Sequence, residues 1–237
     1  MLSDSAILSV NKITKSFGDT CIFKDISFEL NEGEVLSVLG QSGVGKTTLL
    51  RVIANLTLPC TGSVSIPEVN KDKIGFVFQN YFIFPWLCVR QNVEFGQAEK
   101  NSEDVDRILA DVGLLEYRDS PTNNLSGGQL QRLAVARSMI LKPKLLLMDE
   151  PFSDLDVHNK SKLYELVRGL VTNHKMSFII VTHDVSESVK ISDRIVVLSG
   201  IPASVGNTFV VRDFARNELE NEIIKLLNKS HDSQPDK

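Results

Sequence analysis

The chain has 237 residues, of which 42% are hydrophobic and 24% are charged, as in an ordinary globular protein. Its formal net charge is −4 and it has no long basic run, so composition gives no reason to expect nucleic-acid binding. It also lacks an apolar stretch of about 18 residues, so we expect no segment that crosses a bilayer by itself.

The first third of the chain has the pattern of short strands around one helix. A turn at Gly18-Asp19 separates the first two strands, and a glycine-rich turn precedes a helix over about 46–55. The strands are expected at residues 6–13, 21–30, 35–39, 62–66 and 73–78.

The glycine-rich turn matches the phosphate-binding pattern G-x-x-x-x-G-K-[ST] and lies between an apolar strand and a helix, as that pattern requires. Its residues are Gly40, Gln41, Ser42, Gly43, Val44, Gly45, Lys46, Thr47 and Thr48. Glycines let successive backbone N–H groups face an anion, and the helix adds its positive N-terminal end. We expect Lys46 to reach the β- and γ-phosphates, Thr47 to bind Mg²⁺ and Thr48 to add a phosphate contact. The alternative is a glycine-rich turn that binds nothing.

The middle of the chain, about residues 85–142, is predicted to be a mostly helical insert between strands. Apolar residues recur at helical spacing after residue 102, and a second helix is expected from Ser126 to about residue 141, before Pro143. Ser126 and Gln129 have the S-x-x-Q spacing of a capping box, which places a helix N-terminus there.

That second helix begins in Leu125, Ser126, Gly127, Gly128 and Gln129. Two glycines permit close backbone approach to a ligand, so the turn predicts a second anion-binding helix terminus. One nucleotide does not easily need two such termini. We therefore infer that this turn covers the γ-phosphate of a nucleotide held by another copy, in a head-to-tail dimer. An ordinary capped helix with flexible glycines is the alternative.

Two continuous apolar runs, at 144–148 and 177–182, suit parallel strands that are covered on both faces. An apolar stripe between them predicts a crossover helix, and the alternation argues for a doubly wound α/β sheet. The first run ends in Asp149 and Glu150, and the second ends in His183. Since ligands bind at the carboxyl ends of parallel strands, we expect these groups and the glycine-rich turn to meet at one edge.

Asp149 is then placed to hold Mg²⁺, and Glu150 to orient and polarise the attacking water. Side chains alternate along a strand, so both carboxylates serve one site only if the chain turns directly after Met148, which Pro151 favours. His183 is expected to hydrogen-bond the γ-phosphate. The alternatives are solvated loop acids and a surface histidine.

In order and spacing, the turn at 40–48, the Leu-Ser-Gly-Gly-Gln segment at 125–129 and the acid pair resemble those of ATP-binding cassette ATPases. The resemblance implies an α/β fold: a RecA-like P-loop NTPase core, an N-terminal antiparallel β-subdomain and the helical subdomain at about 85–142. It implies one nucleotide-binding domain over 1–230, a polar tail at 231–237, and ATP with Mg²⁺ as ligands.

Further residue roles follow from the same resemblance. Phe17 is similar to the aromatic residue that stacks on adenine, although the family usually has tyrosine. Gln79 resembles the glutamine that senses Mg²⁺ and links to the membrane subunits. Asp156 resembles the aspartate of the dimer-contacting D-loop, in which Asp154 replaces the common alanine. His183 resembles the family's switch histidine.

A narrower resemblance follows Gln79. The segment Phe84-Pro85-Trp86-Leu87, with 89–93, is similar to importers of nitrate, sulfonates and taurine. It implies a homodimer or paired ATPase subunits on the cytoplasmic side of the membrane, bound to transmembrane permease subunits and served by a periplasmic or extracellular solute-binding protein. Packing of Trp86 within the helical insert is equally compatible with the sequence. An exporter or lipoprotein-release ATPase, a soluble cassette protein acting on DNA or ribosomes, and a nucleotide kinase are the rival functions.

Overall fold

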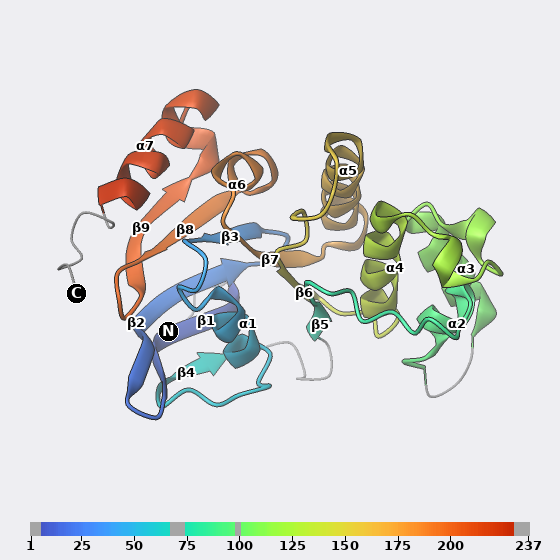
Figure 1. The fold of residues 1–237 in the computed structure, drawn as a ribbon, viewed down its shortest axis with the longest axis horizontal. Coiled ribbons are helices and arrows are strands. Elements are labelled where there is room, and N and C mark those ends of the chain that lie inside the picture. The colour runs from blue at the N-terminus through green and yellow to red at the C-terminus, as the bar shows by residue number, and fades with distance from the viewer. Residues whose placement is uncertain (1–5, 67–73, 98–100, 230–237) are drawn as a thin grey trace.

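The computed structural model describes residues 6–66, 74–97 and 101–229, so the expected tail at 231–237 lies outside the described residues. Figure 1 shows two sheets beside a group of helices made by α2 (Val89–Glu94), α3 (Ser102–Asp111) and α4 (Gly127–Met139). In the described part of the chain, no helix combines the length and apolarity needed to cross a bilayer.

The smaller sheet is antiparallel, with strand order β2-β1-β4. It contains β1 (Ala6–Phe17), β2 (Thr20–Asn31) and β4 (Thr61–Ser65). The first two strands are longer than predicted because their pairing continues to the tip of the hairpin, where Phe17 lies opposite Thr20.

The larger sheet has six strands in the order β5-β6-β7-β3-β8-β9. They are β3 (Val35–Leu39), β5 (Ile74–Val77), β6 (Leu145–Asp149), β7 (Ser177–Thr182), β8 (Arg194–Ser199) and β9 (Ser204–Val210). All neighbours are parallel except β9, which runs antiparallel to β8. The predicted parallel α/β sheet is confirmed, and β3 and β7 have the predicted bounds.

The central strands of this sheet are buried on both faces, which explains their continuous apolar runs. Leu146 and Met148 of β6 pack with residues of α4 and α5 (Val157–His174). Leu145 and Leu147, pointing the other way, pack with α1 (Lys46–Ile53) and the smaller sheet.

Two further helices, α6 (Val185–Ile191) and α7 (Arg216–Lys229), pack beside β8 and β9. The remaining short helices are η2 (Leu115–Tyr117), η3 (Thr122–Asn124) and η4 (Val211–Asp213). Helix α1 ends two residues earlier than predicted, just before Asn55, which adopts a left-handed backbone with a φ of 57°.

Candidate functional site

The glycine-rich turn connects the carboxyl end of β3 to the start of α1. Gly43 and Gly45 have φ angles of 81° and 100°, a region that favours glycine over residues with a Cβ. The Lys46 side chain is buried and folds over the turn, with Nζ donating to the carbonyl oxygens of Gly40 at 2.9 Å and Gln41 at 3.0 Å. The turn therefore presents one ammonium group and a helix N-terminus at the same place.

Asp149 lies at the end of β6 and is 4% exposed. Its Oδ1 accepts a hydrogen bond from Thr47 Oγ1 at 3.0 Å, which joins β6 to the first turn of α1. Burial raises the pKa of the Asp149 carboxyl, and the negative charge of Glu150 adds to this shift, while the Thr47 hydrogen bond and nearby cations oppose it.

A hydroxyl and a carboxylate side by side form the oxygen set that Mg²⁺ prefers. The described residues contain no group of three or more His, Cys, Asp and Glu side chains that could hold a metal ion by itself. Mg²⁺ sites that depend on substrate phosphates use few protein ligands, so Thr47 and Asp149 fit such a site.

Glu150 makes the turn that brings both carboxylates into one site. The prediction of a turn directly after Met148 is wrong by one residue, since β6 continues through Asp149. Glu150 adopts a φ of 47°, and its N–H donates to the carbonyl of Val181 at 3.0 Å. The left-handed backbone of Glu150 thus takes the place of the turn expected directly after Met148. Because the chain turns at Glu150, the side chains of Asp149 and Glu150 do not alternate to opposite faces as they would in a continuing strand.

The Glu150 carboxylate lies between the other polar groups of the site. Its Oε1 is 3.3 Å from Lys46 Nζ, and its Oε2 is 2.8 Å from His183 Nδ1. His183 directly follows β7, which lies between β3 and β6 in the sheet. The structure therefore confirms that these three strands bring their polar ends to one edge.

Two predicted residues make no hydrogen bond to this cluster among the described residues. Gln79 is exposed and lies two residues after Val77, the last residue of β5. Val77 pairs with Met148 of β6, and Glu150 lies two residues after Met148, so Gln79 and Glu150 occupy matching positions after neighbouring strands. Phe17 is 54% exposed at the end of β1, and Lys15 Nζ lies 4.9 Å from its ring centroid. Lys15, which was not predicted from the sequence, therefore covers part of the ring.

The segment 125–129 starts α4 as predicted. Ser126 Oγ accepts from the N–H of Gln129 at 3.3 Å, and the Ser126 N–H donates to Gln129 Oε1 at 2.8 Å. The capping box is confirmed. Figure 1 shows α4 and α1 in separate parts of the molecule, so this turn does not face the glycine-rich turn of its own chain.

The two glycines of this turn have different surroundings. A Cβ added at Gly128 would overlap with the side chain of Asn159 on α5, whereas a Cβ added at Gly127 would meet no atom of the described chain within 4 Å. Asn159 was not predicted from the sequence. Its position three residues after a capping aspartate was the available signal.

Asp156 caps α5, with its Oδ1 accepting from the N–H of Asn159 at 2.9 Å and its Oδ2 from Asn159 Nδ2 at 2.8 Å. These hydrogen bonds lower the pKa of the Asp156 carboxyl. Asp154, two residues earlier, faces Tyr81: burial raises the pKa of that phenol, and the Asp154 charge raises it further. The segment before α5 thus lies close to the segment that follows Gln79.

Comparison with known proteins gives matches over most of the chain. The family model described as "ABC transporter" matches residues 23–153, more than half of the chain. An aliphatic sulfonates import ATP-binding protein from Xanthomonas axonopodis pv. citri is 39% identical over 214 residues, 86% of this chain and 85% of the relative. A nitrate import ATP-binding protein from Synechocystis is 38% identical over 201 residues, 79% of this chain and 74% of the relative.

Polyamine importers match as well. A spermidine/putrescine import ATP-binding protein from Mycoplasma mycoides is 37% identical over 209 residues, 83% of this chain but 60% of the relative. Among solved structures, cbiO1 from Clostridium perfringens, part of the ABC transporter complex cbiONQ, has a TM-score of 0.82 and 27% identity, and covers 95% of this chain and 96% of its own. A dimeric ATP-binding cassette with bound ADP and phosphate has a TM-score of 0.74 and 29% identity, over 87% of this chain and 100% of its own.

Proposed function

This chain belongs to the ABC transporter family and is an ATPase with the P-loop fold of that family, and we propose that it powers solute import through a membrane permease. One observation carries the catalytic part of the proposal. Glu150, which follows β6, lies within ion-pair distance of Lys46 at the start of α1 and within hydrogen-bond distance of His183 after β7, at the ligand-binding edge of the sheet.

ATP is the proposed substrate, held by residues 40–48. The backbone N–H groups of the turn and the start of α1 would bind the β- and γ-phosphates, and Lys46 would exchange its carbonyl partners for phosphate oxygens. Phe17 would stack on the adenine with the part of its ring that Lys15 leaves uncovered.

Mg²⁺ would be held by Thr47 and Asp149, with Gln79 near it. When bound, the ion offsets the negative charge that spreads over the β- and γ-phosphates during transfer. The Thr47–Asp149 hydrogen bond supports this proposal because it keeps the two oxygen ligands adjacent in the folded chain.

Hydrolysis would proceed by in-line attack of water on the γ-phosphorus, with cleavage of the bond between that phosphorus and the bridging oxygen of ADP. Glu150 would orient the water and polarise its O–H bond. His183, whose Nδ1 contacts the Glu150 carboxylate in the single chain, would donate one ring N–H to a γ-phosphate oxygen when ATP binds. Lys46 would stabilise the charge on the transferred group.

The partner chain would complete the site. Residues 125–129 of a second copy, or of a paired ATPase subunit, would cover the γ-phosphate, with Asp156 near the contact. Gly127 supports this assignment because the space beside it is open in the single chain. ADP lacks the covered phosphate, so hydrolysis would release the two chains.

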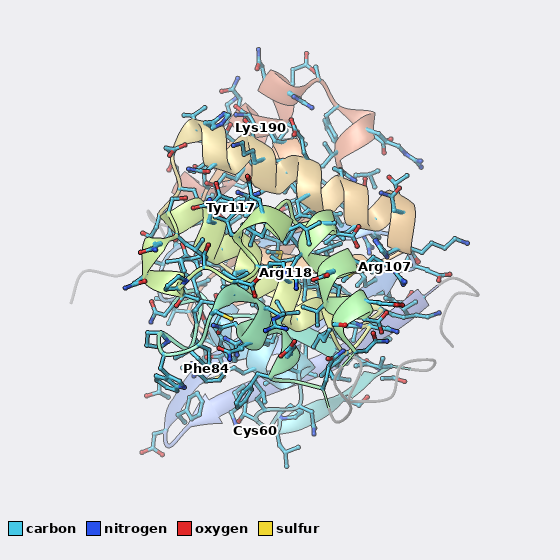
Figure 2. All side chains as sticks on the ribbon, turned by 90° about the vertical axis from the view of Figure 1, so that its right-hand side faces the viewer. Cys60, Phe84, Arg107, Tyr117, Arg118 and Lys190 are labelled. Atoms are coloured by element: carbon cyan, nitrogen blue, oxygen red, sulfur yellow. The ribbon has the colours of Figure 1, made fainter. Side chains whose placement is uncertain are left out.

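The permease would dock on an aromatic groove of about 230 Å³ between β5, α2 and α4. Exposed Phe82 and Phe95 line it, with Trp86, 76% exposed, beside it. Phe84, at the lower margin of the helices in Figure 2, packs against Trp86 and under the guanidinium of Arg137. These contacts would hold the segment around Phe84 and Trp86 in place as a binding surface for a helix of the permease.

The finer assignments belong to the same proposal. Residues 1–230 would form the nucleotide-binding domain, with the helical subdomain at about 85–142. The chain would work on the cytoplasmic side of the membrane and import a small anion or organic solute of the nitrate, sulfonate or taurine type, delivered by a solute-binding protein. The sulfonate and nitrate relatives, which match over most of their length, favour this solute class over polyamines.

A Glu150→Gln variant tests the proposed function. It should retain ATP affinity but lose at least about 100-fold in hydrolysis rate, because the water loses its orienting carboxylate, and it should accumulate as an ATP-bound dimer. The control is Glu165→Gln, at an exposed position on α5. ATP turnover and light scattering are the measurements.

Normal turnover by the Glu150→Gln variant would contradict the catalytic role. In cells that rely on this chain, the variant should also abolish uptake of the transported solute. Unchanged uptake of both sulfonates and nitrate would contradict the proposed import function.

A further inference from the structure

Gln131, in the second turn of α4, is buried without a hydrogen-bond partner. Its side chain is 1% exposed, and neither Oε1 nor Nε2 finds a partner among the described residues. A primary amide has two donors and an acceptor oxygen, so the whole polar end of this side chain is unsatisfied.

The other buried atoms without partners belong to groups that are otherwise engaged. Arg90 Nε lies 3.6 Å from the Asp119 carboxylate. Asp106 Oδ1 lacks a partner, but the other oxygen of that carboxylate accepts from Arg118 at 2.8 Å. Among the described residues, Gln131 alone is both buried and wholly unsatisfied.

This position is energetically unfavourable in the single chain. A buried amide without partners destabilises the folded chain relative to an apolar side chain of similar shape. Methionine has nearly the same length, forms helices well and would avoid that cost. A partner that is present in another state of the molecule gives the amide a physical reason to be there.

The position of Gln131 on α4 identifies where that partner lies. Residues three apart share a face of a helix, so Gln131 lies one turn beyond Gly128, the residue packed against Asn159 of α5. This face therefore lies toward the start of α5, which the segment 153–156 directly precedes. Buried Leu155 of that segment belongs to the same core cluster as Leu133 and Val135 of α4.

The segment before α5 has backbone groups to offer. Ser153 and Leu155 use their N–H groups in local turns, but the carbonyls of Ser153, Asp154 and Leu155 accept no hydrogen bond from any described residue. The N–H of Asp154 also donates to none of them. A movement of α4 toward this segment would offer the amide both a donor and an acceptor.

We propose that Gln131 is a positioning residue that ties α4 to the backbone of residues 153–155 when two chains enclose ATP. This inference rests on the proposed function. In the nucleotide-free chain the amide is unsatisfied, and in the ATP-bound dimer it donates to a carbonyl of the segment and accepts from the Asp154 N–H. Closure of the dimer and placement of α4 are thereby coupled through one buried side chain.

The test is Gln131→Met in the Glu150→Gln background, with Ser138→Ala as the control. Ser138, further along α4, bonds the carbonyl of Phe76 and not the 153–155 segment, so its loss lowers stability alone. Gln131→Met should leave the melting temperature of the nucleotide-free chain unchanged or higher. It should raise the ATP concentration for half-maximal dimerisation about fivefold or more, as measured by light scattering.

Dimerisation at an unchanged ATP concentration would overturn the inference and leave a water molecule as the partner of Gln131 in both states. If the methionine variant does not fold, hydrogen exchange on the Glu150→Gln chain decides. ATP should protect the Asp154 amide, and an unprotected amide would overturn the inference. A Glu150→Gln chain that does not dimerise with ATP at all would instead contradict the proposed function.

Discussion

At the residue scale, the site depends on placing a carboxylate where water cannot reach it well. Asp149 is buried at the end of β6, and its raised pKa reflects the free energy needed to keep it ionised there. A raised pKa means that the folded chain holds this proton at a pH where the unfolded chain has lost it. The free energy of unfolding therefore decreases as the pH rises through the pKa of Asp149.

Asp149→Asn is therefore expected to stabilise the metal-free chain at neutral pH. Asparagine can still accept the Thr47 hydrogen bond but carries no charge to desolvate. The variant's melting temperature should equal or exceed that of the wild type at pH 7, and the difference should vanish below the ordinary carboxyl pKa of 3.8. Thermal melts between pH 3 and pH 8 check this.

Asp156→Ala is the matched control, with the opposite sign. Hydrogen bonds from Asn159 lower the pKa of Asp156, so its stabilising contribution is present above 3.8 and is lost as the pH falls through the folded value. This variant should melt lower than the wild type at pH 7. If Asp149→Asn melts at a lower temperature than the wild type at every pH, desolvation of the Asp149 charge does not limit the stability of the site.

Some features of single residues could be predicted from the sequence and others could not. The order of the motifs predicted which side chains meet, and the Glu150–His183 contact bears this out. It did not predict that Glu150 itself makes the turn, because a φ of 47° is uncommon in a residue other than glycine and has no local signature. Nor did it predict Gln131, since a glutamine in a helix is usually exposed.

At the element scale, the two glycines at the start of α4 serve different purposes: Gly128 permits close packing against α5, and Gly127 leaves space for the proposed contact with ATP. A Cβ added at Gly128 would meet Asn159 of α5, whereas a Cβ added at Gly127 would meet no atom of another described segment within 4 Å. Glycine is therefore required at these two adjacent positions for two different physical reasons, which the sequence alone did not distinguish.

The pair Gly128→Ala and Gly127→Ala tests this separation. The added methyl at Gly128 must displace Asn159, so we expect a loss of about 1–3 kcal/mol in the free energy of unfolding. Alanine at Gly127 should leave stability nearly unchanged but weaken ATP-driven dimerisation. Denaturant unfolding and light scattering check the two parts, and equal stability losses in both variants would contradict the separation.

Element prediction followed burial for most of the larger sheet, but it missed β8, whose apolar run is also buried. The strands β3 and β7 are buried throughout, and their continuous apolar runs gave the correct bounds. The hairpin β8–β9 and the helix α6 were not predicted. β9 is a mostly exposed edge strand with polar residues, and α6 is only seven residues long, too short for a clear helical period.

At the scale of the whole molecule, the central feature of the proposed mechanism is a catalytic site shared between two chains. Within one chain, the phosphate-binding turn and the capped start of α4 lie in separate parts of the structure. A head-to-tail pair with two-fold symmetry would bring the turn of each chain to the helix of the other and would form two equivalent sites.

Mixing two inactive variants tests the shared site most directly. Lys46→Ala disables the phosphate-binding turn, and Gly127→Asp, at the open position, places a negative charge at the proposed γ-phosphate contact. Each variant alone should be inactive. In a mixed dimer, one site combines the intact turn of one chain with the intact helix start of the other, so an equal mixture should recover ATP hydrolysis at up to about a quarter of all sites. A mixture of the two folded variants that stays as inactive as each alone would contradict the shared site.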